Sequence, residues 1–319
     1  MVGAFKISFV TASPHAPVPP HDFPPARTVL VPGRGEFFLR DSGLADQPAP
    51  APRFGAASAR PVVFMLHGWT GSADLNFGGL YDDVIAAGYR VVALDHRGHG
   101  RGPRPLVPFR LTDCADDAAA VMRLLGIAPA IVYGYSMGGA IGQLLARDHP
   151  GVVKALLLSG TAQHWQEPEL RRVWRAMPAL GLGLSLAPGS GWRAALRRSG
   201  FSPGPAMAWV HSEMIRHNPR HIAQAGRELG RFDSRPWLAP LPFPTAVLLT
   251  SRDDAVPPAK QRELAAALAA PVFEAPVRHL EVAAMAGPQA AARYNPVLIA
   301  ALEALRSAAP SGTLALDEA

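Results

Sequence analysis

The sequence predicts an α/β protein in which a mostly parallel, doubly wound sheet is covered by helices on both faces and carries an inserted helical cap. Short, uninterrupted apolar runs alternate with helical patterns from residue 61 onward, and such runs are typical of strands buried on both faces. Segment 161–235 interrupts this alternation with helical patterns and no clear strand. The 319 residues, of which 49% are hydrophobic and 18% charged, suffice for a sizeable core and exclude a disordered chain.

The N-terminal part of the chain predicts an arm followed by a hairpin. Residues 1–26 are rich in proline and lack periodicity, so we expect an arm without regular structure. Two β-like runs, 28–31 and 36–40, flank a Pro-Gly-Arg-Gly turn and indicate a hairpin. The Ala-, Pro- and Gly-rich residues 44–60 predict a surface loop.

The remaining elements follow from periodicity and from glycines at helix ends. Buried strands are expected at 62–66, 90–94, 130–133, 154–158 and 246–249, and a short last strand at 271–275. Core helices are expected at 80–87 and 115–125, each closed by a glycine, and at 283–305 near the C-terminus. Within the cap, helical patterns cover 170–177 and 206–215, and 180–186 is an apolar stretch interrupted by glycines. The predicted core therefore comprises 27–160 and 236–306, the cap 161–235 and a C-terminal tail 307–319.

The strand at 130–133 leads into Gly134-Tyr135-Ser136-Met137-Gly138-Gly139 and then into a helical pattern. Flanking glycines permit a sharp strand-to-helix turn that raises the serine hydroxyl above the sheet at a helix N-terminus. A phosphate-binding glycine loop would require a nearby lysine, and none is present. Ser136 is therefore the candidate nucleophile.

A serine nucleophile needs a histidine base that a carboxylate orients, and in this strand-turn-helix arrangement the chain order is Ser, acid, His. His279 is the histidine that follows the last strand-end carboxylates, so it is the candidate base. The strand at 246–249 is followed by Asp253 and Asp254; we prefer Asp253 from its spacing to the Val-Pro turn, and Asp254 remains the alternative.

The loop after the strand at 62–66 begins His67-Gly68-Trp69, and its glycine permits a turn that directs a backbone N–H inward. We expect the N–H groups of Trp69 and Met137 to form the oxyanion hole. His67 is expected to be structural. His96 and His99 lie in a glycine-rich loop without a convincing third ligand, so no metal site is predicted.

These motifs, HGWTGS, DHRGHGRG, GYSMGG, the Asp253 turn and His279, together resemble the α/β-hydrolase fold superfamily over about residues 27–306. Within it the chain is similar to the capped serine esterase, lipase and perhydrolase-like (cofactor-free haloperoxidase) group. Two positions depart from the family pattern, because Thr250 and Arg278 stand where glycine is common. The resemblance implies a serine hydrolase of carboxylic esters that uses the triad Ser136, Asp253 and His279 without a cofactor. Perhydrolysis by the same triad and an inactive binding protein are the alternatives.

The charge distribution and the hydropathy limit which partners and substrates can be expected. The cap holds eleven Arg, no Lys and five Asp or Glu, which accounts for the net charge of +6. Because the excess is local and no recognition motif is visible, nucleic-acid binding is not expected. We expect a small-molecule ester with an apolar acyl group as substrate, and the basic cap is a candidate surface for anionic substrates or peripheral membrane contact.

The absence of a long apolar run and of a secretory signal predicts a cytoplasmic protein without a transmembrane segment. The oligomeric state is not predicted.

Overall fold

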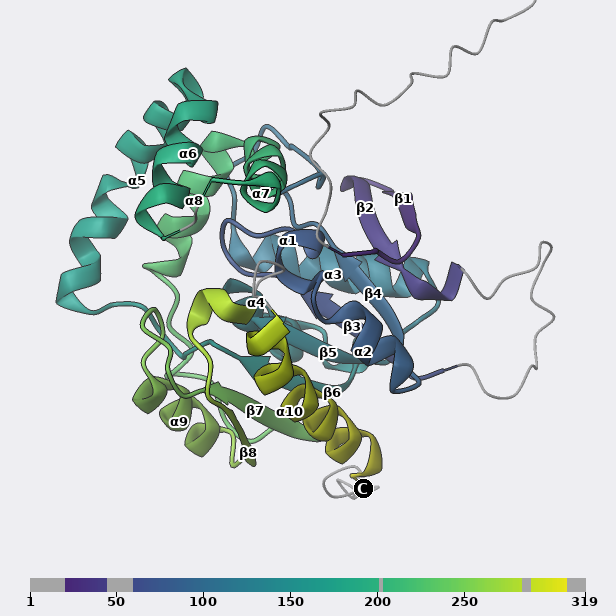
Figure 1. Ribbon diagram of the computed structural model, residues 1–319. Coiled ribbons are helices and arrows are strands. Elements are labelled where there is room, and N and C mark those ends of the chain that lie inside the picture. Colours follow the sequence, from purple (N-terminus) through teal and green to yellow (C-terminus); the bar gives the residue numbers. More distant parts are fainter. Residues whose placement is uncertain (1–20, 45–59, 201–202, 283–287, 309–319) are drawn as a thin grey trace, which may run out of the picture.

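In the computed structural model, which describes residues 21–44, 60–200, 203–282 and 288–308, eight strands form one twisted sheet (Figure 1). Their order across the sheet is β1-β2-β4-β3-β5-β6-β7-β8. The strands are β1 Ala26–Val31, β2 Gly35–Asp41, β3 Val62–Leu66, β4 Arg90–Leu94, β5 Ala130–Tyr135, β6 Val153–Ser159, β7 Thr245–Thr250 and β8 Val272–Ala275. Every strand that the sequence predicts is therefore present, most with a shift of one or two residues at an end.

The sheet is parallel from β4 to β8 and antiparallel at the β1–β2 edge. Strands β1 and β2 form the predicted hairpin, in which Val31 is opposite Gly35, and β2 pairs antiparallel with β4. The pairs β4–β3, β3–β5, β5–β6, β6–β7 and β7–β8 are all parallel. Because parallel strands share a direction, the residues that follow β3, β5, β6, β7 and β8 gather at one edge of the sheet.

Helices cover both faces of the sheet. Their bounds are α1 Ala73–Phe77, α2 Tyr81–Ala86, α3 Leu111–Leu124, α4 Met137–Asp148, α5 Pro168–Leu186, α6 Pro188–Arg198, α7 Pro205–Ile215, α8 Pro219–Leu229, α9 Pro258–Ala267 and α10 Pro288–Ser307. Helices α3, α4 and α9 pack on one face, and α1, α2 and α10 pack on the other. All six residues of β5 are buried, as expected for a central strand with helices on both sides. Cys114 is buried in α3, where it packs as a small apolar residue.

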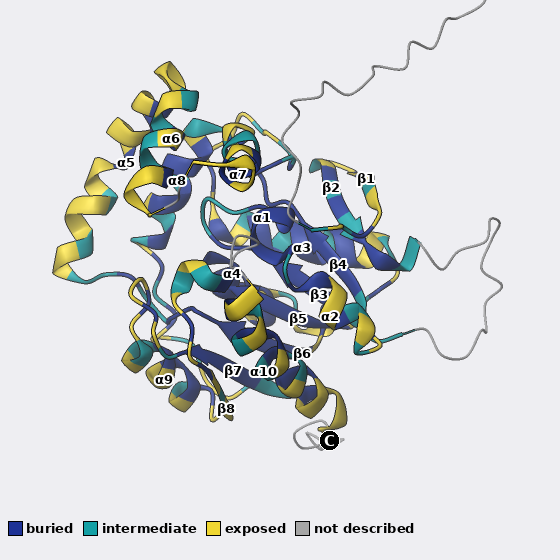
Figure 2. Cartoon of the chain, viewed as in Figure 1, coloured by how far each residue is buried: buried dark blue, intermediate teal, exposed yellow. Residues whose placement is uncertain are grey.

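Four helices, α5 to α8, form an insertion between β6 and β7 that lies over the edge of the sheet where the parallel strands end (Figure 1). We call these four helices the helical insertion. Figure 2 shows that α5 is mostly exposed, and only Met177, Gly181 and Leu184 of its nineteen residues are buried. The glycine-interrupted stretch 180–186 is the last part of α5, which continues past Pro178.

Other differences from the expected elements have local causes. Phe23 lies in the arm to which the sequence assigned no structure, yet its ring packs against Tyr81 of α2 and Trp209 of α7 at centroid distances of 6.3 and 5.8 Å. Helix α1 was not expected; its five residues are too few to show a period, although the Ser72 side chain caps it by accepting from the Leu75 N–H. The last helix is described from Pro288, so its predicted start at 283 lies outside the described residues, as do 1–20, most of the loop 44–60 and the tail from 309.

Candidate active site

Ser136 occupies the sharp turn between β5 and α4, with φ 55° and ψ −117°. A positive φ is costly for a residue with a side chain, so the surrounding structure must enforce it. It does so through a hydrogen bond from the Ser136 N–H to the Ser159 carbonyl of β6, 3.0 Å, and through close approach at Gly138. A Cβ at Gly138 would lie 1.8 Å from the Leu66 carbonyl oxygen, so only glycine lets the start of α4 approach the end of β3.

The structure brings Ser136, His279 and Asp253 together, although 143 residues separate the first two. His279 Nε2 lies 3.0 Å from Ser136 Oγ, and His279 Nδ1 lies 2.8 Å from Asp253 Oδ2. The Asp253 side chain is fully buried and that of His279 is 13% exposed. Because the buried carboxylate accepts a hydrogen bond from Nδ1–H, the proton of the neutral ring stays on Nδ1. Nε2 is therefore free to accept the proton of the serine hydroxyl.

Asp253, rather than Asp254, is the carboxylate at this site. The backbone N–H groups of Ala255 and Val256 donate to Asp253 Oδ1 at 2.9 and 2.8 Å, and the Thr250 hydroxyl donates to Oδ2 at 2.7 Å. Asp254 is exposed. The threonine that departs from the family pattern thus orients the acid, since its hydroxyl shares Oδ2 with His279.

His279 begins a short 3₁₀ helix, His279–Val282, after β8. The Tyr135 hydroxyl donates to the His279 carbonyl oxygen at 2.5 Å, and the two rings lie 5.1 Å apart. The residue before the nucleophile therefore also fixes the position of the base. Sequence reasoning missed this role, because a tyrosine between glycine and serine has no pattern that announces a contact 144 residues away.

The loop after β3 is held by hydrogen bonds on both sides of Gly68. Its N–H donates to Asn76 Oδ1 at 2.7 Å, and its carbonyl accepts from His67 Nδ1 at 2.8 Å and from the Gly71 N–H at 3.1 Å. A Cβ at Gly68 would lie 3.2 Å from the Ser136 Cβ, so this loop lies directly against the serine. Trp69 follows Gly68 in that loop.

Met137, the other expected oxyanion donor, is the first residue of α4, so its N–H has no acceptor within the helix. The two N–H groups thus belong to segments that both adjoin Ser136. A helix N-terminus also carries a partial positive charge that favours negative charge developing beside it.

Three histidines of the neighbouring loops are buried and packed ring against ring. His67 lies 4.3 Å from His96 and 5.4 Å from His99, measured between centroids. Burial lowers the pKa of all three well below the ordinary value. His67 is structural as expected, since its Nε2 accepts from the His96 N–H at 3.0 Å. Among the described residues, no group of three or more His, Cys, Asp or Glu has the arrangement of a metal site.

The helical insertion is bonded directly to the loop that follows β3. Trp69 Nε1 donates to the Ile222 carbonyl of α8 at 2.9 Å. His217, between α7 and α8, donates from Nε2 to the Thr70 carbonyl at 3.0 Å and accepts at Nδ1 from the Gly100 N–H at 2.8 Å. Burial lowers the pKa of His217 to about 4, so its ring is neutral and can serve as donor and acceptor at once.

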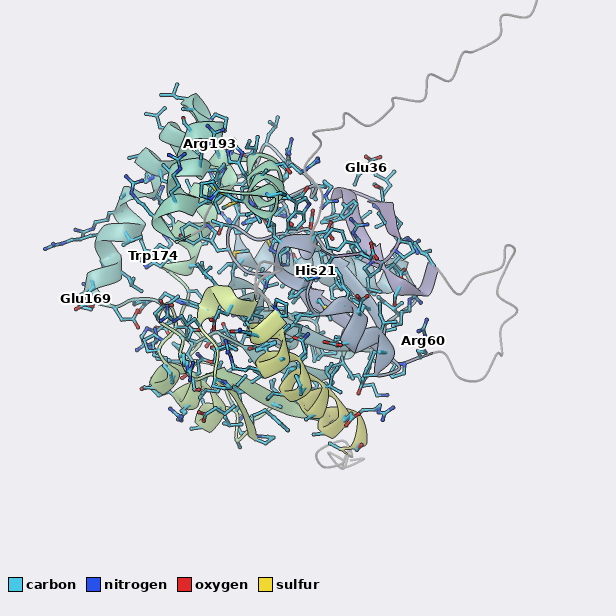
Figure 3. The ribbon with its side chains drawn as sticks, in the orientation of Figure 1. His21, Glu36, Arg60, Glu169, Trp174 and Arg193 are labelled. Carbon is cyan, nitrogen blue, oxygen red and sulfur yellow. The ribbon has the colours of Figure 1, made fainter. Side chains whose placement is uncertain are left out.

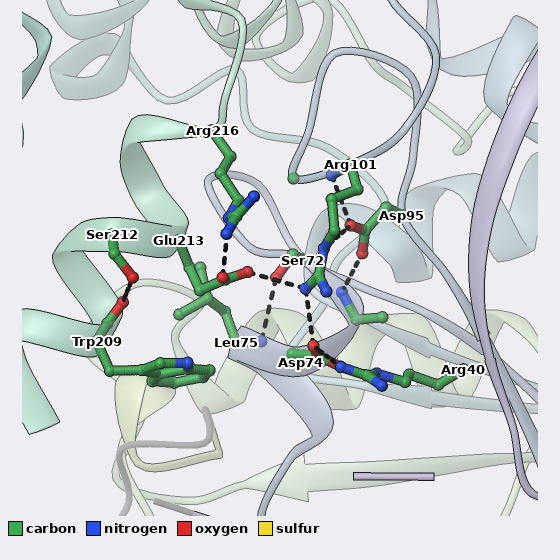
Figure 4. A network of polar contacts seen from close by, with 12 residues as sticks. Arg40, Ser72, Asp74, Leu75, Asp95, Arg101, Trp209, Ser212, Glu213 and Arg216 are labelled. Carbon is green, nitrogen blue, oxygen red and sulfur yellow. Dashed lines mark hydrogen bonds and ion pairs between the residues drawn. The ribbon is translucent and has the colours of Figure 1, made fainter. Parts of the chain in front are cut away.

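A charged network joins the same helices to the core (Figure 4). Arg101 donates to Asp74 of α1 at 2.7 Å and to Glu213 of α7 at 2.9 Å, so one guanidinium links the core and the insertion. Arg40 of β2 donates to the other oxygen of Asp74 at 2.8 Å. Asp95 accepts from the backbone N–H groups of Ala73 and Arg101, both at 2.7 Å, while burial raises its pKa to about 6.

A cavity of about 330 Å³ opens beside Ser136 and His279, between the core and the helical insertion. Its apolar lining comes from both parts of the chain: Leu75, Leu180, Trp192, Leu196, Val210 and Met214. The helical insertion and the segment leading into it hold Trp165, Trp174, Trp192 and Trp209, and of these four only Trp192 lines this cavity. Leu182 and Leu186 of the stretch 180–186 are exposed, whereas Leu180 lines the cavity. Trp69, from the core loop, is a further lining aromatic.

Comparison with known proteins agrees with this architecture. Residues 61–281 match the family described as alpha/beta hydrolase fold. The chain is 39% identical over 108 residues to a non-heme chloroperoxidase of Streptomyces lividans, covering 33% of this chain and 38% of that protein. It is 33% identical to a monoacylglycerol lipase of Mycolicibacterium smegmatis, covering 64% of this chain and 74% of the lipase.

Among solved structures, an enol-lactonase of Burkholderia xenovorans superposes with a TM-score of 0.68 at 22% identity, covering 87% of this chain and all of that chain. At this identity the likeness concerns the fold alone. The chain covers less than half the length of the chloroperoxidase, so only the family is established by these matches. The chain belongs to the alpha/beta hydrolase fold family. No helix in the described part is long and apolar enough to cross a membrane.

Proposed function

We propose that this protein is a serine hydrolase that cleaves carboxylic esters with an apolar acyl group. The observation that carries the proposal is the continuous hydrogen-bonded line from the buried Asp253 carboxylate through His279 to the Ser136 hydroxyl, at 2.8 and 3.0 Å. The Ser136 end of this line adjoins an apolar cavity. The monoacylglycerol lipase relative also supports action on an ester.

The mechanism has two steps. In the first, Ser136 Oγ bonds to the ester carbonyl carbon as its proton passes to His279 Nε2, and the negative oxygen is stabilised by the N–H groups of Trp69 and Met137. The carbon–oxygen bond then breaks, and the alcohol leaves with the proton from Nε2. In the second step a water molecule gives a proton to Nε2 and attacks the acyl group, which releases the acid and restores Ser136. Asp253 remains ionised and holds the ring orientation throughout.

The test combines a covalent probe with an ester series. A fluorophosphonate is expected to label the wild-type protein at Ser136 and not Ser136→Ala. Hydrolysis of p-nitrophenyl esters is expected to fall by about 10⁴ to 10⁶-fold in kcat in that variant. Equal turnover by the two proteins contradicts the proposal, and a wild-type chain that neither reacts with the probe nor hydrolyses any ester is a binding protein instead.

The apolar lining predicts a dependence on acyl length. Each methylene that moves from water into the cavity contributes about 0.8 kcal/mol, so kcat/KM should rise by about fourfold per methylene from the acetate ester upward until the cavity is filled. A series that shows no rise with length argues against binding of the acyl group in this cavity.

A second candidate, perhydrolysis, is favoured by the chloroperoxidase relative. Hydrogen peroxide would take the place of water in the second step and give a peracid, with the same residues acting. Adding peroxide to the ester assay and measuring peracid against free acid distinguishes the two activities, and Ser136→Ala should abolish both.

A further inference from the structure

A second hollow lies on the helical insertion between α5 and α8, with a volume of about 380 Å³. Four arginines line it, Arg171 and Arg175 from α5, Arg227 from the last turn of α8 and Arg231 from the turn that follows α8, and all four are exposed. We call it the arginine groove. Within the described chain, none of its lining residues also lines the cavity beside Ser136.

Four positive charges line the groove, and they outnumber the carboxylates paired with them. Arg171 and Arg175 are four residues apart on α5, so they share a helix face and their like charges repel. Arg231 follows the end of α8 and lines the groove together with Arg227. Of these four arginines, only Arg231 forms an ion pair within the part of the chain that the structure describes, with Glu228 at 3.2 Å. An anion between the two helices would relieve this repulsion.

The groove has a fixed aromatic floor. The Trp174 indole lines it, donates from Nε1 to the Trp165 carbonyl at 2.8 Å, and lies edge-on to Trp69 at 5.9 Å. Gly230 makes room for that ring, because a Cβ there would lie 2.5 Å from two atoms of the indole. The fold therefore fixes the position of this ring, and the four arginines line the same groove.

The number and type of cations indicate the ligand. A guanidinium presents a planar fork of N–H donors that matches two oxygens of a phosphate. Four such groups around one hollow fit a ligand with at least two negative charges, such as a phosphomonoester or a diphosphate, better than a single carboxylate.

We propose that the arginine groove binds a phosphate-bearing ligand. This inference goes beyond the proposed ester hydrolysis and does not depend on it, since no groove residue takes part in the reaction. The phosphate has two sources, a free phosphorylated compound or the headgroup of an anionic lipid, and both would meet the same four side chains.

The experiment measures binding to the full-length protein. Inorganic pyrophosphate is titrated by calorimetry, and cosedimentation is measured with vesicles of phosphatidylcholine alone and of phosphatidylcholine mixed with phosphatidic acid. The test variant replaces one arginine on each helix, Arg175→Glu with Arg227→Glu. The control makes the same charge change on α6, Arg193→Glu with Arg197→Glu; Figure 3 shows Arg193 well apart from Trp174.

Binding in the test variant should weaken by at least about tenfold while the control changes by less than about twofold, and added salt should weaken binding by the wild type. The milder pair Arg175→Gln with Arg227→Gln, expected to weaken binding to a lesser degree, guards against a folding defect. Pyrophosphate binding identifies a free phosphate compound; binding to acidic vesicles alone identifies a lipid headgroup. Three outcomes overturn the proposal: no binding of either probe, equal loss of binding in the test and control variants, or vesicle binding that is the same with and without phosphatidic acid when pyrophosphate does not bind.

Discussion

The edge of the sheet that carries Ser136 and the helical insertion above it differ in how firmly they are held. The chain that holds Ser136 is mostly buried: all residues of β5 are buried, and Asp253 accepts hydrogen bonds from two backbone N–H groups and one hydroxyl. In α5, by contrast, three of nineteen residues are buried. The reacting groups therefore lie in the most buried part of the chain, whereas part of the wall of the acyl cavity comes from a helix that is largely exposed.

Polar contacts join the two regions in addition to apolar packing, and His217 illustrates them. His279 lies at the core edge and bonds to a carboxylate and a hydroxyl, whereas His217 comes from the insertion and bonds to two backbone groups of core loops. The first ring is placed to exchange a proton. The second, neutral and buried, holds the loop that contains Trp69 in register with α7 and α8.

The largest expected effect separates the two adjacent aspartates of the core edge. Asp253→Asn should lower kcat for ester hydrolysis by about 10⁴-fold, because the amide no longer stabilises the protonated imidazole or fixes its tautomer. Asp254→Asn is the matched control and should leave kcat within about twofold of wild type, since that side chain is exposed. Steady-state kinetics on one ester with both variants measures this. Equal losses of kcat in the two variants would show that Asp253 is not the catalytic carboxylate.

A smaller effect is expected at the junction, by which we mean the contacts between the helical insertion and the core loops after β3 and β4. His217→Gln should lower kcat by about 10 to 100-fold with a lesser change in KM, because the loop beside Ser136 loses its register with the nucleophile. His211→Gln is the control, since His211 bonds to the Gly189 carbonyl within the insertion and reaches no core loop. If the two variants have the same kcat, the contact between His217 and Thr70 does not position the loop.

The junction also predicts how stability depends on pH. The pKa values of His67, His96, His99 and His217 are lowered in the folded chain, so each binds a proton on unfolding between its folded pKa, about 4 for His217, and the ordinary value of 6.5. The free energy of unfolding therefore decreases on acidification through this window.

Asp95 opposes this trend, because its pKa of about 6 lies above its ordinary value of 3.8 and acidification between these values favours the folded state. Four histidines outweigh one aspartate, so Tm should be lower at about pH 5 than at about pH 7. His217→Gln should reduce this difference by removing one of the four groups. Thermal unfolding followed by circular dichroism tests it, and a Tm that is the same at both pH values contradicts the assignment of neutral buried rings.

The smallest effect concerns the insertion alone. Leu180 lines the cavity, whereas Leu182, two residues along α5, is 62% exposed and does not. Leu180→Ala should lower the ratio of kcat/KM for an octanoate ester to that for an acetate ester by about fivefold, through lost apolar contact. Leu182→Ala should leave that ratio unchanged and shift the free energy of unfolding by no more than about 0.5 kcal/mol. Identical ratios in the two variants would remove α5 from the acyl pocket.

The sequence predicted the core better than the insertion for a physical reason. Strands buried on both faces are continuous apolar runs, and a nucleophile turn needs glycines at fixed offsets. Both features can therefore be recognised from neighbouring residues in the sequence. The proximity of Ser136, Asp253 and His279 followed from chain order and the strand ends alone. The roles of Thr250 and Tyr135 were not predictable, because each depends on a side chain that reaches a partner brought near by the fold.

The insertion lacked such local signals. Its helix α5 runs past Pro178 and glycines that would end an isolated helix, because packing against α8 and α6 overrides propensity there. The part played by His217 was equally hidden: a histidine between two helices looks the same in sequence whether it faces solvent or bonds to two core loops.

The exposure of α5 has a consequence for how this sequence can evolve. Substitutions along its exposed face disturb few buried neighbours, so they carry little risk of unfolding the sheet on which Ser136, Asp253 and His279 depend. Yet the same helix supplies Leu180 to one hollow and two arginines to another. Descendants of this sequence can therefore acquire new ligand preferences through α5 while their reactive groups stay in place.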